Sequence, residues 1–200
     1  MHIHASGGSC IKLSLMKNKA YVYKHFIPIE TSRTQYLPFV DRGQKIDKTT
    51  LGIKTLLLNE GDKTFTIVRN PYMRFLATYN FLLNGGNGND LSIKYRDILL
   101  EYDGFENTVK NIKMLKKQIA HFIDQYEFIT SNDGLINVDS ILKFENLEDD
   151  LKNYDNNISI SKHKNFSEND VENIEYLTDY TKNLIYKAYK KDFDTFNYDM

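Results

Sequence analysis

The chain has 200 residues, of which 41% are hydrophobic and 26% are charged, ordinary values that exclude a disordered or fibrous protein. This length suits one domain with its own core, so we expect a single domain over residues 1–200. Lys and Arg total 26 against 27 Asp and Glu. The resulting formal charge of -1 argues against non-specific binding to nucleic acid or to an anionic membrane.

The single cysteine, Cys10, cannot form an internal disulfide, which fits a reducing compartment. The first residues lack the basic flank and the apolar run of a signal peptide. No segment contains the ~18 consecutive apolar residues that a membrane-spanning helix needs. We therefore expect a cytoplasmic protein.

The first part of the chain alternates predicted strands with predicted helices. Residues 1–5 predict a short strand, and the glycine turn at 6–9 joins it to a helix. The aromatic and β-branched residues 20–26 predict a second, buried strand. Leucines among polar neighbours predict a helix over 48–59.

The clearest strand in the sequence is 64–69, and a helix is predicted to follow it directly. Asn70 and Pro71 provide an N-cap residue and a proline at the first helical position, so this helix is expected over 71–83. The glycine and asparagine loop 84–89 ends it.

The remainder is predicted to be mainly helical. Apolar residues at helical spacing run through 91–125, with Gly104 as a break between two helices. Short strands are predicted at 126–130 and 135–142 on either side of a turn.

Two more helices are predicted near the end of the chain, at 144–154 and 178–191. Because strands and helices alternate, we expect an α/β fold of three layers, in which a parallel sheet is flanked by helices. Such sheets bind ligands at the carboxyl ends of their strands.

Two segments at predicted strand ends suit anion binding. The turn Ser6-Gly7-Gly8-Ser9-Cys10 would expose backbone N–H groups at a helix start, as a phosphate requires, although it could be only a structural turn. It is not a Walker A motif. Arg69 would face the same crevice, with a capping or ion-pair role as its alternative. Arg74 lies inside the next helix, where a structural ion pair is the stronger interpretation.

Several segments, in the same order, resemble the carbohydrate sulfotransferases, the family that uses 3'-phosphoadenosine 5'-phosphosulfate (PAPS). They are Ile3-His4-Ala5-Ser6-Gly7-Gly8-Ser9-Cys10-Ile11, Val68-Arg69-Asn70-Pro71-Tyr72 with Arg74, Phe75 and Tyr79, Lys143-Phe144-Glu145-Asn146-Leu147, His163-Lys164-Asn165-Phe166-Ser167, and the aromatic pattern of 185–198. The resemblance implies a P-loop-NTPase-like sulfotransferase fold, PAPS as cofactor, adenosine 3',5'-bisphosphate as product and no metal.

The resemblance also implies a set of cofactor ligands. The 5'-phosphosulfate would be surrounded by Ser6, Gly7, Gly8, Ser9 and Cys10, and Arg69 would bind the 3'-phosphate through its bidentate guanidinium. The family's second 3'-phosphate ligand, a serine, falls on Ala77, which leaves neighbouring Thr78 as the expected substitute. Independently of the resemblance, Lys164 belongs to a cluster of lysines late in the chain, and it would contact the anionic cofactor or an acidic glycan unless it lies on a solvated helix face.

One departure from the family concerns the leaving group. The lysine that contacts the bridging oxygen of the leaving phosphate falls on Ala5. Because charge moves onto that oxygen during transfer, a missing cation should lower the rate unless another residue replaces it. His4, Lys12 and Lys24 are the candidates, and the sequence does not choose among them.

The acceptor hydroxyl needs a general base. The family commonly places a histidine or glutamate at or just after the second strand, where this chain has His25. Imidazole titrates near neutral pH, which suits proton abstraction, and Glu30 is the runner-up. His25 could instead be a partly buried histidine bonded to the backbone. A metal site built from the histidines is disfavoured, because no Asp or Cys stands at ligand spacing.

We therefore expect a sulfotransferase that moves a sulfuryl group from PAPS to a hydroxyl acceptor, of carbohydrate type. The alternative is a catalytically inactive relative that binds a nucleotide or glycan, and Ala5 is its main support. A P-loop nucleotide kinase is disfavoured by the absence of Gly-Lys-Ser/Thr.

Overall fold

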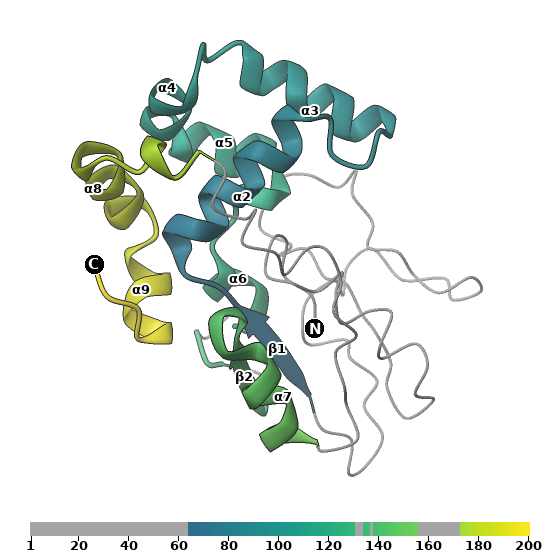
Figure 1. Ribbon diagram of the computed structural model, residues 1–200, viewed down its shortest axis with the longest axis vertical. Coiled ribbons are helices and arrows are strands. Elements are labelled where there is room, and N and C mark those ends of the chain that lie inside the picture. Colours follow the sequence, from purple (N-terminus) through teal and green to yellow (C-terminus); the bar gives the residue numbers. More distant parts are fainter. Residues whose placement is uncertain (1–63, 131–133, 137, 156–172) are drawn as a thin grey trace. The chain divides into compact units, whose positions relative to one another are not determined.

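The computed structural model describes residues 64–130, 134–136, 138–155 and 173–200 (Figure 1). The strands predicted at 1–5 and 20–26, and the helix predicted at 48–59, lie outside these residues. The described residues form two compact units. The first unit contains residues 64–68 and 125–155, and the second contains Arg69–Asp124 and residues 173–200.

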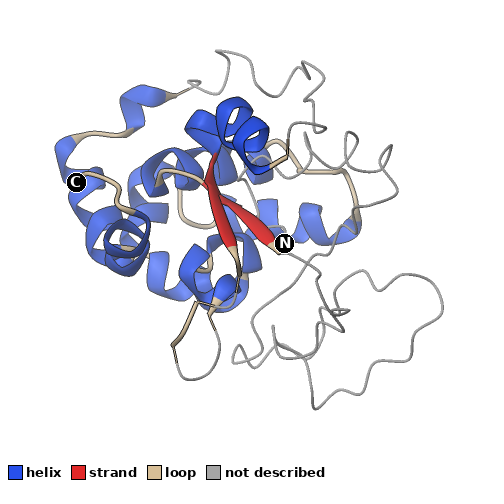
Figure 2. Ribbon diagram, turned by 90° about the horizontal axis from the view of Figure 1, so that it is seen from below, coloured by secondary structure: helices blue, strands red, loops and turns tan. Residues whose placement is uncertain are grey.

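The first unit is built on two parallel strands, β1 (Phe65–Val68) and β2 (Ser140–Lys143), which lie side by side in Figure 2. Phe65 pairs with Ser140 and Val68 with Lys143, so both strands end at the same edge. Ahead of the strands, the Thr64 backbone N–H and hydroxyl both donate to the Asp139 carboxylate, at 2.6 and 2.8 Å. The parallel pairing agrees with the expectation of a parallel sheet.

A short helix covers this pair of strands. After the 3-10 turn η3 (Phe144–Asn146) comes α7 (Leu147–Tyr154), whose buried Leu147 and Leu151 form a small core with Ile67 and Leu142. The Lys143 backbone N–H donates to Asp150 Oδ2 at 2.7 Å, which fixes the turn between β2 and α7. The helix predicted at 144–154 is therefore confirmed, with a 3-10 turn as its first part.

The strand predicted at 126–130 is wrong. These residues belong to the short helix α6 (Gln125–Ile129), which buries Gln125, Phe128 and Ile129 at helical spacing. A five-residue run rich in apolar residues occurs both in strands and in buried helices. It is too short to show whether its apolar residues follow the spacing of a strand or of a helix. Thr130 keeps one isolated antiparallel bridge to Ile136, and β2 starts only at Ser140.

The second unit is helical throughout its described residues. Its α-helices are α2 (Pro71–Leu83), α3 (Asp90–Leu100), α4 (Phe105–Lys110), α5 (Ile112–Gln118), α8 (Asp179–Ala188) and α9 (Lys190–Phe196), and its 3-10 turns are η2 (Ala120–Phe122) and η6 (Ile174–Tyr176). The prediction for α2 is confirmed, since Pro71 occupies its first turn and Asn70 caps it. A glycine-rich loop follows α2 as expected.

Two of the predicted helices are interrupted. Gly104 precedes α4 with φ of 104°, a conformation that side chains disfavour, so the chain breaks there as predicted. The rest of 91–125 is divided further, at Asn111 and again at Ile119. The helix predicted at 178–191 is likewise divided at Tyr189, where α8 gives way to α9.

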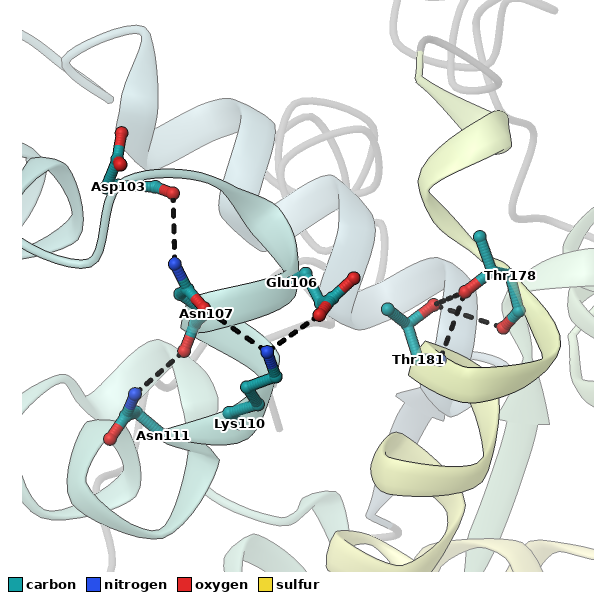
Figure 3. Close-up of polar contacts among 7 residues, drawn as sticks. All are labelled: Asp103, Glu106, Asn107, Lys110, Asn111, Thr178 and Thr181. Atoms are coloured by element: carbon teal, nitrogen blue, oxygen red, sulfur yellow. Dashed lines mark hydrogen bonds and ion pairs between the residues drawn. The ribbon is translucent and has the colours of Figure 1, made fainter.

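The ends of α4 and α8 are held by local polar contacts (Figure 3). The Thr178 hydroxyl accepts from the Thr181 backbone N–H at 3.2 Å and thereby caps α8. On α4, Lys110 Nζ lies 2.7 Å from Glu106 Oε1, one helical turn away. The first contact fixes where α8 begins, and the second links successive turns of α4.

Aromatic rings from distant segments form the core of the second unit. Phe75 on α2 lies 5.6 Å from Phe105, 5.0 Å from Phe122 and 6.2 Å from Tyr189, measured between ring centroids. All four residues are buried. Phe75 therefore joins α2 to α4, to η2 and to the C-terminal helices.

The described residues are thus mostly helical, with two parallel strands. Other strands of the expected three-layer α/β sheet are predicted within residues outside the described part. None of the described helices is long and apolar enough to cross a membrane.

We predict that Phe75→Ala lowers the free energy of unfolding by about 3–5 kcal/mol, because it removes a ring that is only 2% exposed and leaves a cavity. Phe81→Ala is the matched control on the same helix, since Phe81 is 39% exposed and should cost less than about 1 kcal/mol. Urea denaturation followed by circular dichroism measures both. Equal losses in the two variants would contradict the described core.

Candidate functional site

Arg69 lies between the end of β1 and the capped start of α2. The Asn70 side-chain oxygen accepts from the backbone N–H groups of Tyr72, at 3.0 Å, and Met73, at 3.4 Å. The Asn70 carbonyl accepts from the Arg74 N–H at 2.8 Å. The cap fixes the backbone next to Arg69, whose side chain is 6% exposed. A buried guanidinium in a fixed position suits a bidentate anion ligand.

Arg74 has a structural role, in agreement with the stronger interpretation of its sequence position, and two carbonyl groups are among its partners. Its Nη2 donates to the carbonyl oxygens of His121, at 3.0 Å, and Ile123, at 2.7 Å. The side chain is 2% exposed. Arg74 therefore ties α2 to the chain around η2, and these bonds account for its conformation without a ligand.

Thr78 lies on the buried side of α2, nine positions after Arg69. It is 1% exposed, and its Oγ1 has no hydrogen-bond partner among the described residues. A buried hydroxyl without a partner costs about 1–3 kcal/mol, so such an atom calls for an explanation. Neighbouring Ala77, where the family has its serine, is half-buried and brings no donor.

Lys116 was not singled out from the sequence, yet its ammonium group contacts a carboxylate, a carbonyl oxygen and an aromatic ring in the second unit. Its Nζ lies 2.6 Å from Asp124 Oδ2 and 2.6 Å from the Ala188 carbonyl oxygen, and it stands 4.0 Å from the Tyr189 ring centroid. Its partners are eight and 72 residues away in sequence, so no local spacing signals them. The contacts indicate a structural cation that joins α5 to the C-terminal helices.

Two tyrosines of α2 remain protonated at neutral pH. Burial, and then the charge of Tyr186, raises the pKa of Tyr72. Burial, followed by the charge of Tyr176, raises the pKa of Tyr79, which belongs to the family-like pattern that starts at Val68. Neither phenol can therefore act as a base at neutral pH, and Tyr79 serves the core through its ring contact with Phe105.

The other predicted site residues lie outside the described part of the chain. They are Ser6, Gly7, Gly8, Ser9, Cys10, His25 and Lys164, together with Ala5, Glu30 and the candidate replacements for the missing lysine. The structure therefore positions Arg69 and Thr78 of the expected cofactor ligands. The described residues contain no group of three or more His, Cys, Asp or Glu side chains that could hold a metal ion.

Comparison with known proteins adds an independent observation. A protein-family model described as "Sulfotransferase family" matches residues 6–199, a range that includes the glycine turn, Arg69, Thr78 and the C-terminal helices. No curated protein and no solved structure matches the chain significantly.

We predict that Arg74→Met lowers the free energy of unfolding by about 3 kcal/mol, because two carbonyl oxygens, one buried and one partly buried, lose a charged donor. The matched control is Arg96→Met, in which a side chain that is 41% exposed is replaced at a cost of about 0.5 kcal/mol or less. Thermal and urea denaturation check both variants. A stability of Arg74→Met within error of wild type would argue against the structural role.

Proposed function

Because the chain belongs to the sulfotransferase family, we propose that it transfers a sulfuryl group from PAPS to a hydroxyl of a carbohydrate acceptor. The acceptor oxygen forms a bond to sulfur while the bond from sulfur to the bridging phosphate oxygen breaks. The acceptor's proton passes to a base, and adenosine 3',5'-bisphosphate leaves. The family match supports the transferase class, and the resemblance of the individual motifs supports PAPS and the sugar.

The observation that carries the proposal is the position of Arg69. It directly follows a buried parallel strand and precedes a helix whose start is capped by Asn70. A charge-assisted, bidentate bond from a buried guanidinium is stronger than one in water, because the local dielectric constant is lower. In our proposal Arg69 binds the 3'-phosphate, the group that distinguishes PAPS from ATP or AMP.

Thr78 is the second 3'-phosphate ligand in this proposal. Its buried hydroxyl lacks a partner among the described residues, and it stands one position after the alanine that replaces the family's serine. A phosphate oxygen would accept its hydrogen bond and remove the cost of an unsatisfied donor. This role uses the same helix that presents Arg69.

The remaining roles fall on residues outside the described part. We propose that the 5'-phosphosulfate is held by Ser6, Gly7, Gly8, Ser9 and Cys10, and that Lys164 contacts the anionic cofactor. His25 takes the acceptor's proton, with Glu30 as the alternative base. His4, Lys12 or Lys24 supplies the cation that Ala5 does not.

A second candidate function rests on Ala5. Without a cation at the leaving oxygen, the chain would be a relative that binds the nucleotide or a glycan and does not turn it over. Nucleotide binding is compatible with both candidates, and only the transferase predicts release of adenosine 3',5'-bisphosphate from PAPS in the presence of an acceptor.

We predict that adenosine 3',5'-bisphosphate binds more tightly than AMP or ATP in isothermal titration calorimetry. Arg69→Ala should weaken this binding by about 2 kcal/mol or more, as expected for a lost charge-assisted pair. Arg69→Lys keeps the positive charge but loses the bidentate guanidinium. Its affinity for adenosine 3',5'-bisphosphate should lie between those of wild type and Arg69→Ala. Lys117→Ala removes an exposed cation from α5 and is the control with wild-type affinity.

Two results would contradict the cofactor assignment. One is an affinity that does not depend on the 3'-phosphate. The other is wild-type affinity in an Arg69→Lys protein whose circular dichroism spectrum and melting temperature match those of wild type. If Arg69→Ala does not fold, its loss of affinity says nothing about the role of Arg69 in binding. The Arg69→Lys variant is included for that case.

We predict that His25→Gln keeps adenosine 3',5'-bisphosphate binding and lowers turnover by ~10²-fold or more, the usual scale for a lost general base. Release of the bisphosphate from PAPS, measured with the best acceptor from a panel of sugars, gives the rate. Glu30→Gln is the matched comparison and should retain most of the activity. Full activity in His25→Gln would contradict the role of His25 as the general base and leave Glu30 as the candidate.

A further inference from the structure

A short turn that contains Asp103 and Gly104 joins α3 to α4. Both residues are exposed, and both have a positive φ, 51° for Asp103 and 104° for Gly104. The Asp103 backbone N–H donates to the Leu100 carbonyl oxygen at 3.2 Å, and the Asp103 carbonyl oxygen accepts from Asn107 Nδ2 at 3.3 Å. These distances lie at or beyond the long end of the usual range. The turn is therefore held by weak contacts and opens at little cost.

The Asp103 carboxyl group and the Gly104 backbone nitrogen are neighbours that can react with each other. In Figure 3 the carboxylate points away from Asn107, and within the described part of the chain it forms no hydrogen bond or ion pair. Among the described residues, no group accepts a hydrogen bond from the Gly104 N–H either. A Cβ placed on Gly104 would meet nothing within 4 Å, so there is room around the turn. An electrophile and a nucleophile thus stand next to each other, both accessible.

Two Asn-Gly pairs in the loop after α2 carry similar groups in a different environment. In Asn84-Gly85 the glycine N–H donates to the Leu82 carbonyl oxygen at 2.9 Å, and in Asn87-Gly88 it donates to the Gly85 carbonyl oxygen at 2.9 Å. An N–H group that already donates must lose this bond before its nitrogen can attack a side chain. The fold therefore protects both Asn-Gly pairs and leaves the Asp-Gly pair unprotected.

We propose that Asp103 is a modification site, at which the folded chain isomerises slowly to L-isoaspartate. The Gly104 nitrogen forms a bond to Asp103 Cγ, the N–H proton and the carboxyl hydroxyl leave as one water molecule, and a five-membered succinimide results. Water that adds to Cγ restores aspartate. Water that adds to the main-chain carbonyl carbon breaks its bond to nitrogen and gives isoaspartate, whose amide bond to Gly104 comes from Cγ. The step needs no oxidant, reductant or cofactor, and the inference does not depend on the proposed function.

The isomerised turn would disturb the start of α4. Isoaspartate adds one methylene group to the main chain directly before Gly104, whose carbonyl oxygen accepts from the Thr108 N–H at 3.1 Å and from its hydroxyl at 2.8 Å. The next residue, Phe105, is buried, and its ring centroid lies 5.6 Å from that of Phe75 and 5.1 Å from that of Tyr79. Packed cores tolerate such shifts poorly, so isomerised molecules should melt at a lower temperature than unmodified ones.

The first test is a peptide map of the full chain after prolonged storage in mildly acidic buffer, where more of the carboxyl group is protonated and therefore reactive. Electron-transfer fragmentation distinguishes isoaspartate from aspartate, which has the same mass. Isoaspartate should accumulate at Asp103 in the folded wild type. Asp103→Glu is the matched control, because its longer side chain would have to close a six-membered ring, and it should form no such product. The other Asp-Gly pair, at 133–134, includes a residue outside the described part and is followed in a separate peptide.

The decisive variant is Asp103→Asn, which places three Asn-Gly pairs with the same chemistry in one chain. At neutral pH the folded variant should deamidate at position 103 at least ~5-fold faster than at Asn84 or Asn87, the factor expected from breaking one hydrogen bond of ordinary net strength. In concentrated urea the three positions should react at similar rates, because the fold no longer protects two of them. Equal rates in the folded variant would overturn the proposal. So would a folded wild type that forms no isoaspartate at Asp103 under conditions in which its unfolded chain does.

Discussion

The second unit depends on the buried guanidinium of Arg74, which donates to the carbonyl oxygens of residues 47 and 49 positions later in the chain. These bonds fix α2 against the segment around η2, while the aromatic contacts of Phe75 join the same helix to α4 and to Tyr189. With α2 held in this way and capped by Asn70, the backbone before it has little freedom. Arg69 therefore projects from a restrained backbone position, which favours recognition of a phosphate group.

The sequence predicted the parts of this arrangement that rest on local signals. Asn70 and Pro71 gave the start of α2, because capping and a first-turn proline involve only neighbouring residues. Gly104 gave the break before α4, because its backbone conformation favours glycine. The strand before Arg69 was equally clear, and the alternation of strands and helices indicated a parallel sheet without identifying which strand pairs with it.

The parts that sequence did not reveal depend on distant partners or on short segments. Lys116 contacts Asp124 and the Ala188 carbonyl, and the residues next to it in the sequence predict neither contact. The run 126–130 has a strand-like composition, yet residues 126–129 are helical in α6, where Phe128 and Ile129 are buried together with Gln125. Of the candidate site, Arg69 and Thr78 have been placed by the structure, and Thr78 was found by analogy with a serine that this chain lacks.

The central claim is that Arg69 recognises the 3'-phosphate of the sulfuryl donor's nucleotide. A crystal structure of the full chain with adenosine 3',5'-bisphosphate tests it most directly. The account predicts the 3'-phosphate within hydrogen-bond distance of the Arg69 guanidinium, at about 2.7–2.9 Å, with the Thr78 hydroxyl donating to one of its oxygens. A nucleotide bound with its 3'-phosphate in contact with neither residue would contradict it.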